Sequence, residues 1–291
     1  MSATARMTGP AEILADLSRP GTSTTVLRLR AAGGRQMILK GNTSTECFQR
    51  EYAALSRWTP SLGPSAPQLL DADEDAQLLL MTVVAGQPLQ SLTLTLTPCR
   101  ERHVYAQAGA LLARFHDTAP RAVLPSFGAD RAAYIRAQLS DGTEPLTGAD
   151  LSVLDEALHL LETLPAQQAQ PSHLDFTSRN LLVQEKKVGV IDFETSRYEA
   201  VGRDFLRITQ RTLHPRPDLR SAFYQGYGRE PDRAEAELMR ICTVTDAAAI
   251  VVTATGRGQR AFAEEARGAL TAAVRSWPEP PPETAPHGRR L

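Results

Sequence analysis

The first eighty residues carry short apolar runs that predict a β-rich segment. Thr24–Leu29 and Gln36–Leu39 are two such runs, separated by a glycine-containing turn at 32–34. Two runs around a turn of this kind are typical of a β-hairpin. Gln77–Val84 is a third apolar run, and Ala85–Pro88 then interrupts the pattern. We place the boundary between two lobes there.

A helix is predicted between the hairpin and the third strand. Thr43–Glu46 reads Thr-Ser-Thr-Glu and matches the Ser/Thr-x-x-Glu capping box, so we expect a helix that runs to about Trp58. Its apolar face includes Phe48 and Leu55. Glu51 stands three residues after Phe48 and four before Leu55, which puts its carboxylate on that apolar face. A carboxylate on the apolar face of a helix needs a cation nearby.

Beyond residue 88 the apolar periodicity becomes that of helices, with one short pair of strands among them. The expected fold class is therefore α+β, a bilobal protein-kinase-like arrangement with a small β-rich N-lobe containing one helix and a larger, mainly helical C-lobe. We expect the lobes at 1–84 and 85–277 and a disordered tail at 278–291, which has too few apolar residues to pack. The predicted elements are helices Pro98–His116, Asp130–Leu139 and Ala149–Leu164, and strands Leu181–Val183 and Val188–Ile191.

Charge and cysteine content exclude several classes of protein. A net charge of −1 provides no global positive field for nucleic acid or an anionic membrane. Cys47, Cys99 and Cys242 are odd in number and outside any Cys-x-x-Cys spacing, so neither a disulfide framework nor a zinc site is predicted. Residues 1–17 lack the apolar core of a secretory signal, and the longest apolar run, Ala247–Val252, is far shorter than the roughly 20 residues that span a bilayer. We expect a cytoplasmic protein with no nucleic-acid or membrane partner.

Polar residues around the short strand pair carry the strongest chemical signal. Asp175 and Asn180 stand five residues apart in His173–Asn180, and the strand pair returns the chain to Asp192 in Ile191–Glu194. This spacing brings three oxygen-bearing side chains to one end of a hairpin, as phosphoryl transfer requires. Mg²⁺ prefers such hard oxygen ligands and keeps positions for nucleotide phosphates. Taken alone, the residue pattern of His173–Asn180 also occurs by chance in unrelated loops.

Lysine is rare in this chain and is found only at Lys40, Lys186 and Lys187. Lys40 ends the second strand of the predicted hairpin. A compact ammonium there suits the α and β phosphates of a nucleotide, and we predict that it forms an ion pair with Glu51. Considered separately, Lys40 would ordinarily be interpreted as a surface charge at a strand end. Glu51 would be interpreted as a partly exposed carboxylate at the edge of a helix.

The two motifs together resemble the catalytic and metal-binding segments of aminoglycoside phosphotransferases, a family of the kinase-like superfamily that includes antibiotic-resistance enzymes. The resemblance implies that Asp175 is the catalytic base or hydroxyl-orienting residue and that Asn180 and Asp192 are Mg²⁺ ligands. It implies a structural role for His173 in supporting the loop. Asp204 lies in a segment that resembles the family's later Asp-Leu motif, which implies that it anchors the same loop.

In the N-terminal lobe the resemblance implies a nucleotide-binding site. A phosphate-covering turn is expected at residues 21–24, where Ser23 and Thr24 would bind phosphates. Residues 79–86 resemble the interlobe linker of the family. There the Thr82 carbonyl and the Val84 N–H would pair with the purine edge, and Gly86 would permit the chain to turn.

The resemblance implies an O-phosphotransferase that uses ATP or GTP and Mg²⁺ to phosphorylate a hydroxyl of a small molecule. The segment after Arg197, which we expect to line the acceptor site, has at least as many arginines as acids, whereas polycationic aminoglycosides need an acidic pocket. We therefore favour a nucleoside or glycosylated antibiotic as acceptor. A kinase of a small primary metabolite, such as a sugar or an amino alcohol, and a nucleotide-binding pseudokinase with a regulatory role are the alternatives. One departure from the family is Leu174, at a position often filled by glycine.

Overall fold

The computed structural model describes residues 3–18, 24–42, 44–140, 142–185 and 187–278. The chain forms two compact units, one of residues 1–125 with 166–239 and one of residues 126–165 with 240–291. The first unit holds both chemical motifs and all the strands found among the described residues, and the described part of the second unit is helical. The boundary predicted after residue 84 falls inside the first unit.

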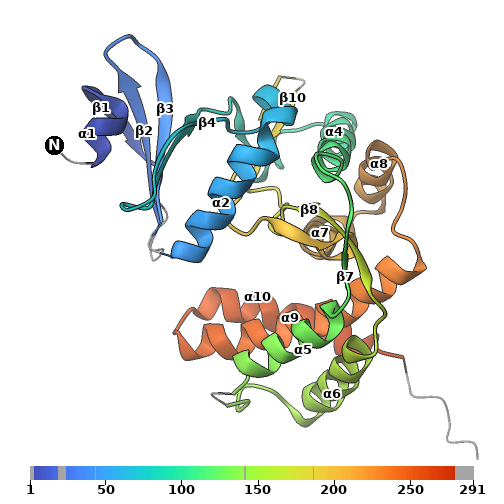
Figure 1. Ribbon diagram of the computed structural model, residues 1–291. Coiled ribbons are helices and arrows are strands. Elements are labelled where there is room, and N and C mark those ends of the chain that lie inside the picture. The colour runs from blue at the N-terminus through green and yellow to red at the C-terminus, as the bar shows by residue number, and fades with distance from the viewer. Residues whose placement is uncertain (1–2, 19–23, 43, 141, 186, 279–291) are drawn as a thin grey trace, which may run out of the picture. The chain divides into compact units, whose positions relative to one another are not determined.

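A five-stranded antiparallel sheet forms the N-terminal part of the first unit, after the short helix α1 (Ala3–Thr8) (Figure 1). The predicted hairpin is β2–β3, in which Leu27 pairs with Leu39, and Leu39 pairs with Leu80 of β5. These leucines share one face of the sheet, and strand alternation therefore turns Lys40 to the opposite face. In sheet order the strands are β1 (Ala11–Asp16), β2 (Thr25–Ala31), β3 (Gln36–Gly41), β5 (Leu78–Thr82) and β4 (Leu69–Asp73).

The predicted helix after the hairpin is α2 (Thr45–Arg57), which lies against β4 and β5 (Figure 1). Phe48 and Leu55 are buried, as the apolar pattern predicted. The helix cap lies one residue later than predicted: the Ser44 hydroxyl accepts from Cys47 N–H at 3.4 Å, and Thr43 lies outside the described residues. Glu46 pairs with Arg50 one turn ahead, so it does not act as the reciprocal partner that a capping box requires.

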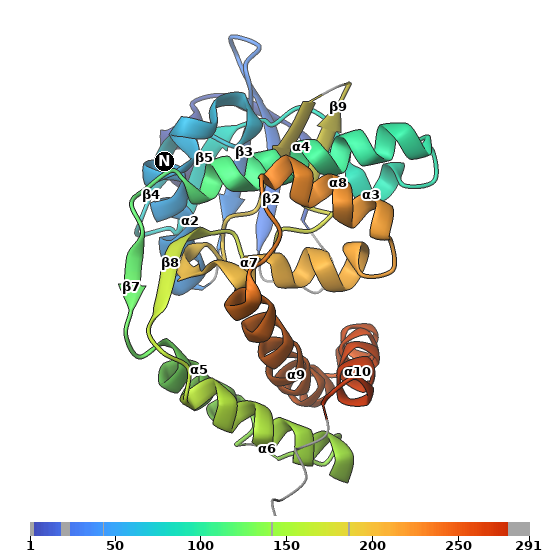
Figure 2. The same cartoon turned by 90° about the vertical axis from the view of Figure 1, so that its right-hand side faces the viewer.

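The rest of the first unit is mainly helical. Helices α4 and α8 lie side by side (Figure 2), so closely that a Cβ on Gly226 would stand 1.8 Å from the Ala106 carbonyl oxygen. This close packing requires glycine. The helical elements are η1 (Thr59–Ser65), α3 (Leu89–Leu92), α4 (Pro98–His116), α7 (Val201–Ile208), the π-helical turn η2 (Thr209–Leu213), α8 (Pro217–Tyr227) and the start of α9 (Arg233–Gly256).

Two small antiparallel sheets support the loops that carry the chemical motifs. The predicted strand pair is β9–β10, and β6 extends it in the order β10-β9-β6. The other sheet has the order β11-β8-β7, and β8 ends immediately before His173. Their bounds are β6 (Gln87–Pro88), β7 (Ala122–Leu124), β8 (Gln167–Ser172), β9 (Leu181–Gln184), β10 (Lys187–Val190) and β11 (Arg197–Ala200).

The second unit consists of α5 (Phe127–Gln138), α6 (Gly148–Glu162), α10 (Arg260–Arg275) and the C-terminal part of α9. The bounds of α5 and α6 lie close to those predicted. Among the described residues, α9 is the one helix long and apolar enough to cross a membrane, yet 61% of that stretch is buried within the protein. The predicted burial of Ala247–Val252 is confirmed for all but Ile250, which is partly exposed.

Candidate active site

The centre of the candidate site is the ammonium of Lys40, which three carboxylates surround. Lys40 Nζ lies 2.8 Å from Glu51 Oε2, 2.7 Å from Asp192 Oδ1 and 3.0 Å from Glu194 Oε2. The predicted Lys40–Glu51 ion pair is therefore present, and a strand of the N-terminal sheet meets a loop 152 residues further along the chain. Glu194 was not expected to take part, although it stands two residues after Asp192 in the quoted motif.

Glu51 links three segments of the first unit. Its Oε2 atom faces Lys40 of β3, and its Oε1 atom accepts a hydrogen bond from Phe193 N–H at 3.3 Å. The Asn42 amide also donates to Glu51 Oε2, at 3.4 Å, and Asn42 accepts from the Thr24 hydroxyl at 3.4 Å. Helix α2, strand β3 and the segment after β10 are thus joined through one buried carboxylate.

Burial and pairing oppose each other in this cluster. Burial alone would lower the pKa of Lys40, but Glu51, Asp192 and Glu194 outweigh it and raise the pKa above its ordinary value. Burial raises the pKa of Glu51, and Lys40 offsets this only in part. For Asp192 the balance is reversed: burial opposes ionisation, yet the Lys40 ammonium holds the pKa below its usual range. One ammonium faces three carboxylates, so the cluster has an excess of negative charge.

The loop that carries Asp175 is held by two buried side chains. His173 Nε2 donates to the Ile191 carbonyl at 3.1 Å, and His173 Nδ1 accepts from Asp175 N–H at 3.2 Å, so the hydrogen bonds assign a neutral ring protonated on Nε2. Asp204 accepts from His173 N–H at 2.7 Å and from Leu174 N–H at 2.6 Å. Leu174 has φ of 62°, the left-handed conformation that favours glycine, in keeping with the glycine that the resemblance implied at this position.

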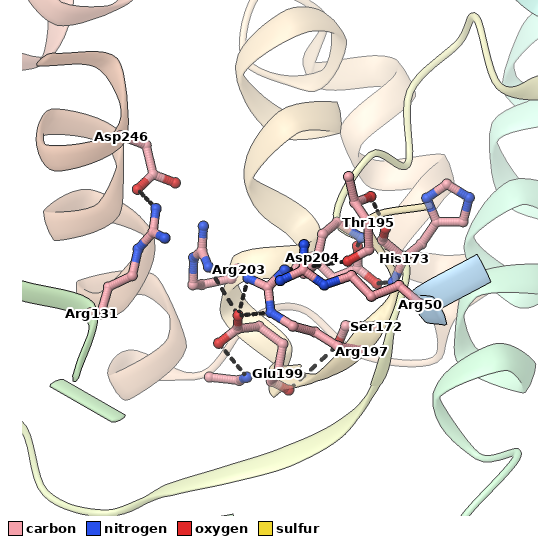
Figure 3. A network of polar contacts seen from close by, with 12 residues as sticks. Arg50, Arg131, Ser172, His173, Thr195, Arg197, Glu199, Arg203, Asp204 and Asp246 are labelled. Carbon is pink, nitrogen blue, oxygen red and sulfur yellow. Dashed lines mark hydrogen bonds and ion pairs between the residues drawn. The ribbon is translucent and has the colours of Figure 1, made fainter. Parts of the chain in front are cut away.

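Asp204 is itself fixed by a buried histidine. His116 Nε2 lies 3.0 Å from Asp204 Oδ2, and His116 Nδ1 lies 2.8 Å from the Tyr227 hydroxyl. Burial would raise the pKa of Asp204, but the hydrogen bonds from His116 and from His173 N–H hold it below its ordinary value. Figure 3 labels Asp204 and His173 in the same network of polar contacts. These contacts fit the anchoring role that the sequence predicted for Asp204.

The carboxylate of Asp175 is paired with two arginines. Arg207 Nη1 lies 2.5 Å from Asp175 Oδ1, and Arg179 Nη2 lies 2.6 Å from Oδ2. Burial opposes ionisation of Asp175, yet Arg207 and Arg179 hold its pKa below the usual range. Arg179 stands four residues after Asp175 in the same motif, so the sequence spacing could have indicated that the two side chains meet. Arg207 lies 32 residues from Asp175, on α7, and no sequence pattern indicated its contact with Asp175.

A backbone hydrogen bond joins the segments that carry Asn180 and Asp192. Ile191 N–H donates to the Asn180 carbonyl at 3.0 Å, and the Asn180 side-chain NH₂ donates to Asp175 Oδ2 at 2.8 Å. The second bond turns the amide oxygen of Asn180 away from Asp175. An amide oxygen, the Asp192 carboxylate and an excess of negative charge form a donor set that fits Mg²⁺. Among the described residues no group of three or more His, Cys, Asp or Glu could hold a metal ion, so phosphate oxygens and water would complete the shell.

The remaining predicted residues lie around the end of β5 and the start of β2. Ser23 is outside the described residues, and Thr24 reaches the Lys40 cluster through Asn42. Thr82 N–H donates to the Gln68 carbonyl at 2.9 Å, while no described group accepts a hydrogen bond from Val84 N–H. Neither Thr82 nor Val84 is hydrogen-bonded to the Lys40 cluster within the described part of the chain. An unpartnered N–H at a strand end is compatible with the predicted recognition of a purine edge.

Solved structures of other proteins share this fold. Aminoglycoside phosphotransferase APH(4)-Ia is 18% identical, with a TM-score of 0.71 over 95% of this chain and 97% of that one. A putative aminoglycoside phosphotransferase from Ralstonia eutropha JMP134 is 15% identical, with a TM-score of 0.70 over 94% and 95%. A choline/ethanolamine kinase family protein from Mesorhizobium loti is 17% identical, with a TM-score of 0.67 over 96% and 92%. A comparison with curated proteins found no match.

These likenesses confirm the predicted α+β class, with a β-rich N-terminal sheet and a helical C-terminal part. At such identities they show the fold alone. A family model described as APH, phosphotransferase enzyme family, matches residues 19–238, which include Lys40, Glu51 and both motifs around Asp175 and Asp192. The chain therefore belongs to the APH phosphotransferase family.

Proposed function

We propose that this protein transfers the γ-phosphate of ATP or GTP, with Mg²⁺, to a hydroxyl of a neutral or weakly charged small molecule. Family membership makes it a phosphotransferase of small molecules. The observation that supports the finer proposal is the distance of 2.7 Å between Lys40 Nζ and Asp192 Oδ1, which joins the predicted phosphate-binding lysine to the predicted metal ligand. A mutant of APH(4)-Ia forms a ternary complex with AMP-PNP and hygromycin B, which supports a nucleotide donor.

Each residue of the cluster has a distinct role in this proposal. Lys40 binds the nucleotide phosphates and is itself held in position by Glu51. Asn180 and Asp192 hold Mg²⁺, which supplies charge neutralisation to the phosphates when bound. Asp175 accepts a hydrogen bond from the acceptor hydroxyl and aligns it for in-line attack. Because its pKa is depressed, Asp175 is a weak base. We therefore assign it the role of orienting the hydroxyl rather than that of removing its proton.

Charge around Asp175 bears on the acceptor. Arg179 and Arg207 lie at the carboxylate that the hydroxyl must approach, and about a third of each arginine side chain is exposed. A polycationic acceptor would meet two guanidinium groups there, which like-charge repulsion disfavours. A nucleoside or glycosylated antibiotic meets no such repulsion. A neutral sugar is the second candidate, and an amino alcohol is disfavoured for the same reason as an aminoglycoside.

Lys40, Asn180 and Asp192 are all present, which argues against a pseudokinase that only binds nucleotide. We also propose a cytoplasmic location, since Cys47, Cys99 and Cys242 are free thiols, which a reducing compartment preserves.

The test is transfer of labelled phosphate by the full chain. Purified protein is incubated with γ-labelled ATP or GTP, with and without Mg²⁺, and with neutral nucleosides, sugars, hygromycin B or kanamycin. We expect Mg²⁺-dependent labelling of a neutral hydroxyl compound and little labelling of the polycations. Asp175→Asn should lower kcat by orders of magnitude and leave thermal stabilisation by nucleotide intact. Near-normal turnover of Asp175→Asn would refute the assignment, and nucleotide binding without transfer to any acceptor would favour the pseudokinase.

A further inference from the structure

A cavity of about 580 Å³ lies in the first unit and shares no lining residue with the Lys40 cluster or the Asp175 loop. One wall is a stripe of α2 that includes Glu46, Arg50 and Arg57, and the other is the segment 196–198. Glu51 lies next to Arg50 in sequence, but successive residues of a helix point about 100° apart. Helix α2 therefore turns Glu51 to Lys40 and Arg50 to the cavity.

The cavity has an excess of positive charge. Arg50, Arg57 and Arg197 line it, and Glu46 is the one acidic residue among the lining side chains. Glu46 is paired with Arg50, whereas Arg57 has no hydrogen-bond or ion-pair partner within the described part of the chain. Of the three guanidinium groups, that of Arg50 is paired with the one lining carboxylate and that of Arg197 with Glu199, which does not line the cavity.

Arg197 shares its own counter-ion with another arginine. Glu199 Oε2 accepts from Arg197 at 2.7 Å and from Arg203 at 3.0 Å, as Figure 3 shows. Burial lowers the pKa of Arg197, and the nearby charges of Arg203 and Arg50 lower it further against the effect of Glu199. An anion in the cavity would relieve this repulsion.

Two further features of the wall suit an organic ligand. Ser196 is 1% exposed, and its hydroxyl has no hydrogen-bond partner in the described structure, although such groups are ordinarily satisfied. Trp58 and Tyr198 supply aromatic surface, with their ring centroids 5.7 Å apart. The wall therefore combines guanidinium donors with aromatic rings, and the buried Ser196 hydroxyl next to it has no partner among the described residues.

We propose that this cavity binds a small organic anion, a phosphate or carboxylate group attached to an aromatic or apolar body. Guanidinium groups bind such groups through charge-assisted hydrogen bonds, and the aromatic wall would contact the apolar part. The bound anion bridges α2 and the segment 196–198, so it stabilises the folded protein. The proposal concerns a site separate from the catalytic one and does not depend on which acceptor is phosphorylated.

The experiment uses phenyl phosphate as the probe and the tryptophan of the cavity as the reporter. The chain has two tryptophans, so Trp277→Phe leaves Trp58 as the one that remains. We expect saturable quenching of Trp58 fluorescence by phenyl phosphate with a Kd of about 1 mM or lower, weakened by salt. Inorganic phosphate should bind more weakly, and phenol should not bind saturably.

Variants in the same Trp277→Phe background locate the site. Arg50→Gln and Arg57→Gln should each raise the Kd about tenfold, the effect of losing one charge-assisted contact. Ser196→Ala should leave the melting temperature of the free protein unchanged or higher, because it removes a buried unsatisfied group. Arg220→Gln, on an exposed pair with Glu230, is the control and should bind normally. No saturable quenching below about 10 mM, or equal affinity in the Arg50→Gln/Arg57→Gln double variant, overturns the proposal.

Discussion

Arg207 Nη1 lies 2.5 Å from Asp175 Oδ1, so an arginine of α7 neutralises the carboxylate proposed to receive the acceptor hydroxyl. Arg179 and Asn180 occupy the other carboxylate oxygen at 2.6 and 2.8 Å. With both oxygens engaged, an incoming hydroxyl must share or displace one of these donors. Arg207 is therefore positioned to control both the ionisation of Asp175 and access to it.

Replacement of Arg207 should move the acid limb of the pH–rate profile. Arg207→Gln removes a charge that lowers the pKa of Asp175, so that pKa should rise and activity should be lost at a higher pH than in the wild type. The measurement is kcat/KM against pH, with Arg220→Gln as the control on an exposed pair. An acid limb at the same pH in Arg207→Gln would contradict this role.

Lys40→Met should impair both catalysis and stability. It removes the only ammonium among Glu51, Asp192 and Glu194, and an uncompensated buried charge costs about 3–5 kcal/mol. We expect kcat/KM for the nucleotide to fall by roughly 10²–10³. Because the pKa of Lys40 is raised on folding, its stabilising contribution is complete below the ordinary lysine value and is lost only as pH rises through the raised value.

Glu51→Gln separates these two effects. The amide oxygen of the glutamine can still accept from Phe193 N–H, and burial already disfavours charge at this position. The loss of stability should therefore be smaller than for Lys40→Met, while the nucleotide KM rises because Lys40 loses a partner. Urea unfolding and steady-state kinetics measure the two, with Glu12→Gln on the exposed pair with Arg30 as the control. Equal destabilisation by Glu51→Gln and Lys40→Met would count against this account.

Asp204→Asn should destabilise the loop of His173 and Leu174. Asp204 accepts from both backbone N–H groups and from His116, and an asparagine would point an NH₂ group at one of these donors. We expect a loss of about 2–4 kcal/mol in the free energy of unfolding. Since the pKa of Asp204 is lowered on folding, its contribution is present above the ordinary aspartate value and is lost as pH falls through the lowered value.

The measurement for Asp204 is urea unfolding at neutral pH and at about pH 3. The difference between wild type and Asp204→Asn should shrink at the lower pH. Asp218→Asn, on a surface pair with Arg216, is the matched control and should cost under about 1 kcal/mol. A difference that does not change with pH would mean that Asp204 does not stabilise the loop as a carboxylate.

Gly86→Ala tests the turn after β5. Gly86 has φ of 129°, and a Cβ there would stand 2.8 Å from the Val183 carbonyl. Conformational strain and steric overlap add, so we expect a loss of about 2–4 kcal/mol. Gly34→Ala is the control: φ is 80° but no atom lies within 4 Å of the added Cβ, so it should cost only about 1 kcal/mol. Thermal unfolding compares them, and equal losses would exclude the steric contribution.

Local pattern was sufficient for most of the elements that frame the site. The β2–β3 hairpin, α4 and the β9–β10 pair follow from alternation, helical period and turn residues, which act over a few neighbours. Strands β1, β4, β6, β7, β8 and β11 were not predicted, because segments of two to six residues that are held by pairing with other strands carry little alternation. The cap of α2 was misplaced by one residue because the prediction followed the capping-box spacing from Thr43 to Glu46, whereas Ser44 is the residue that caps the helix.

The sequence by itself determined which groups could do phosphoryl chemistry, since Asp175, Asn180, Asp192 and the rare Lys40 are recognisable by type and spacing. Only the tertiary structure decided which charges surround them. Glu194 joins Lys40, and Arg207 reaches Asp175, because the folding of β3, α2 and α7 brings distant backbone segments within a few ångströms. Coulombic energy depends on that separation and on burial, and neither quantity is encoded in the spacing of residues along a chain.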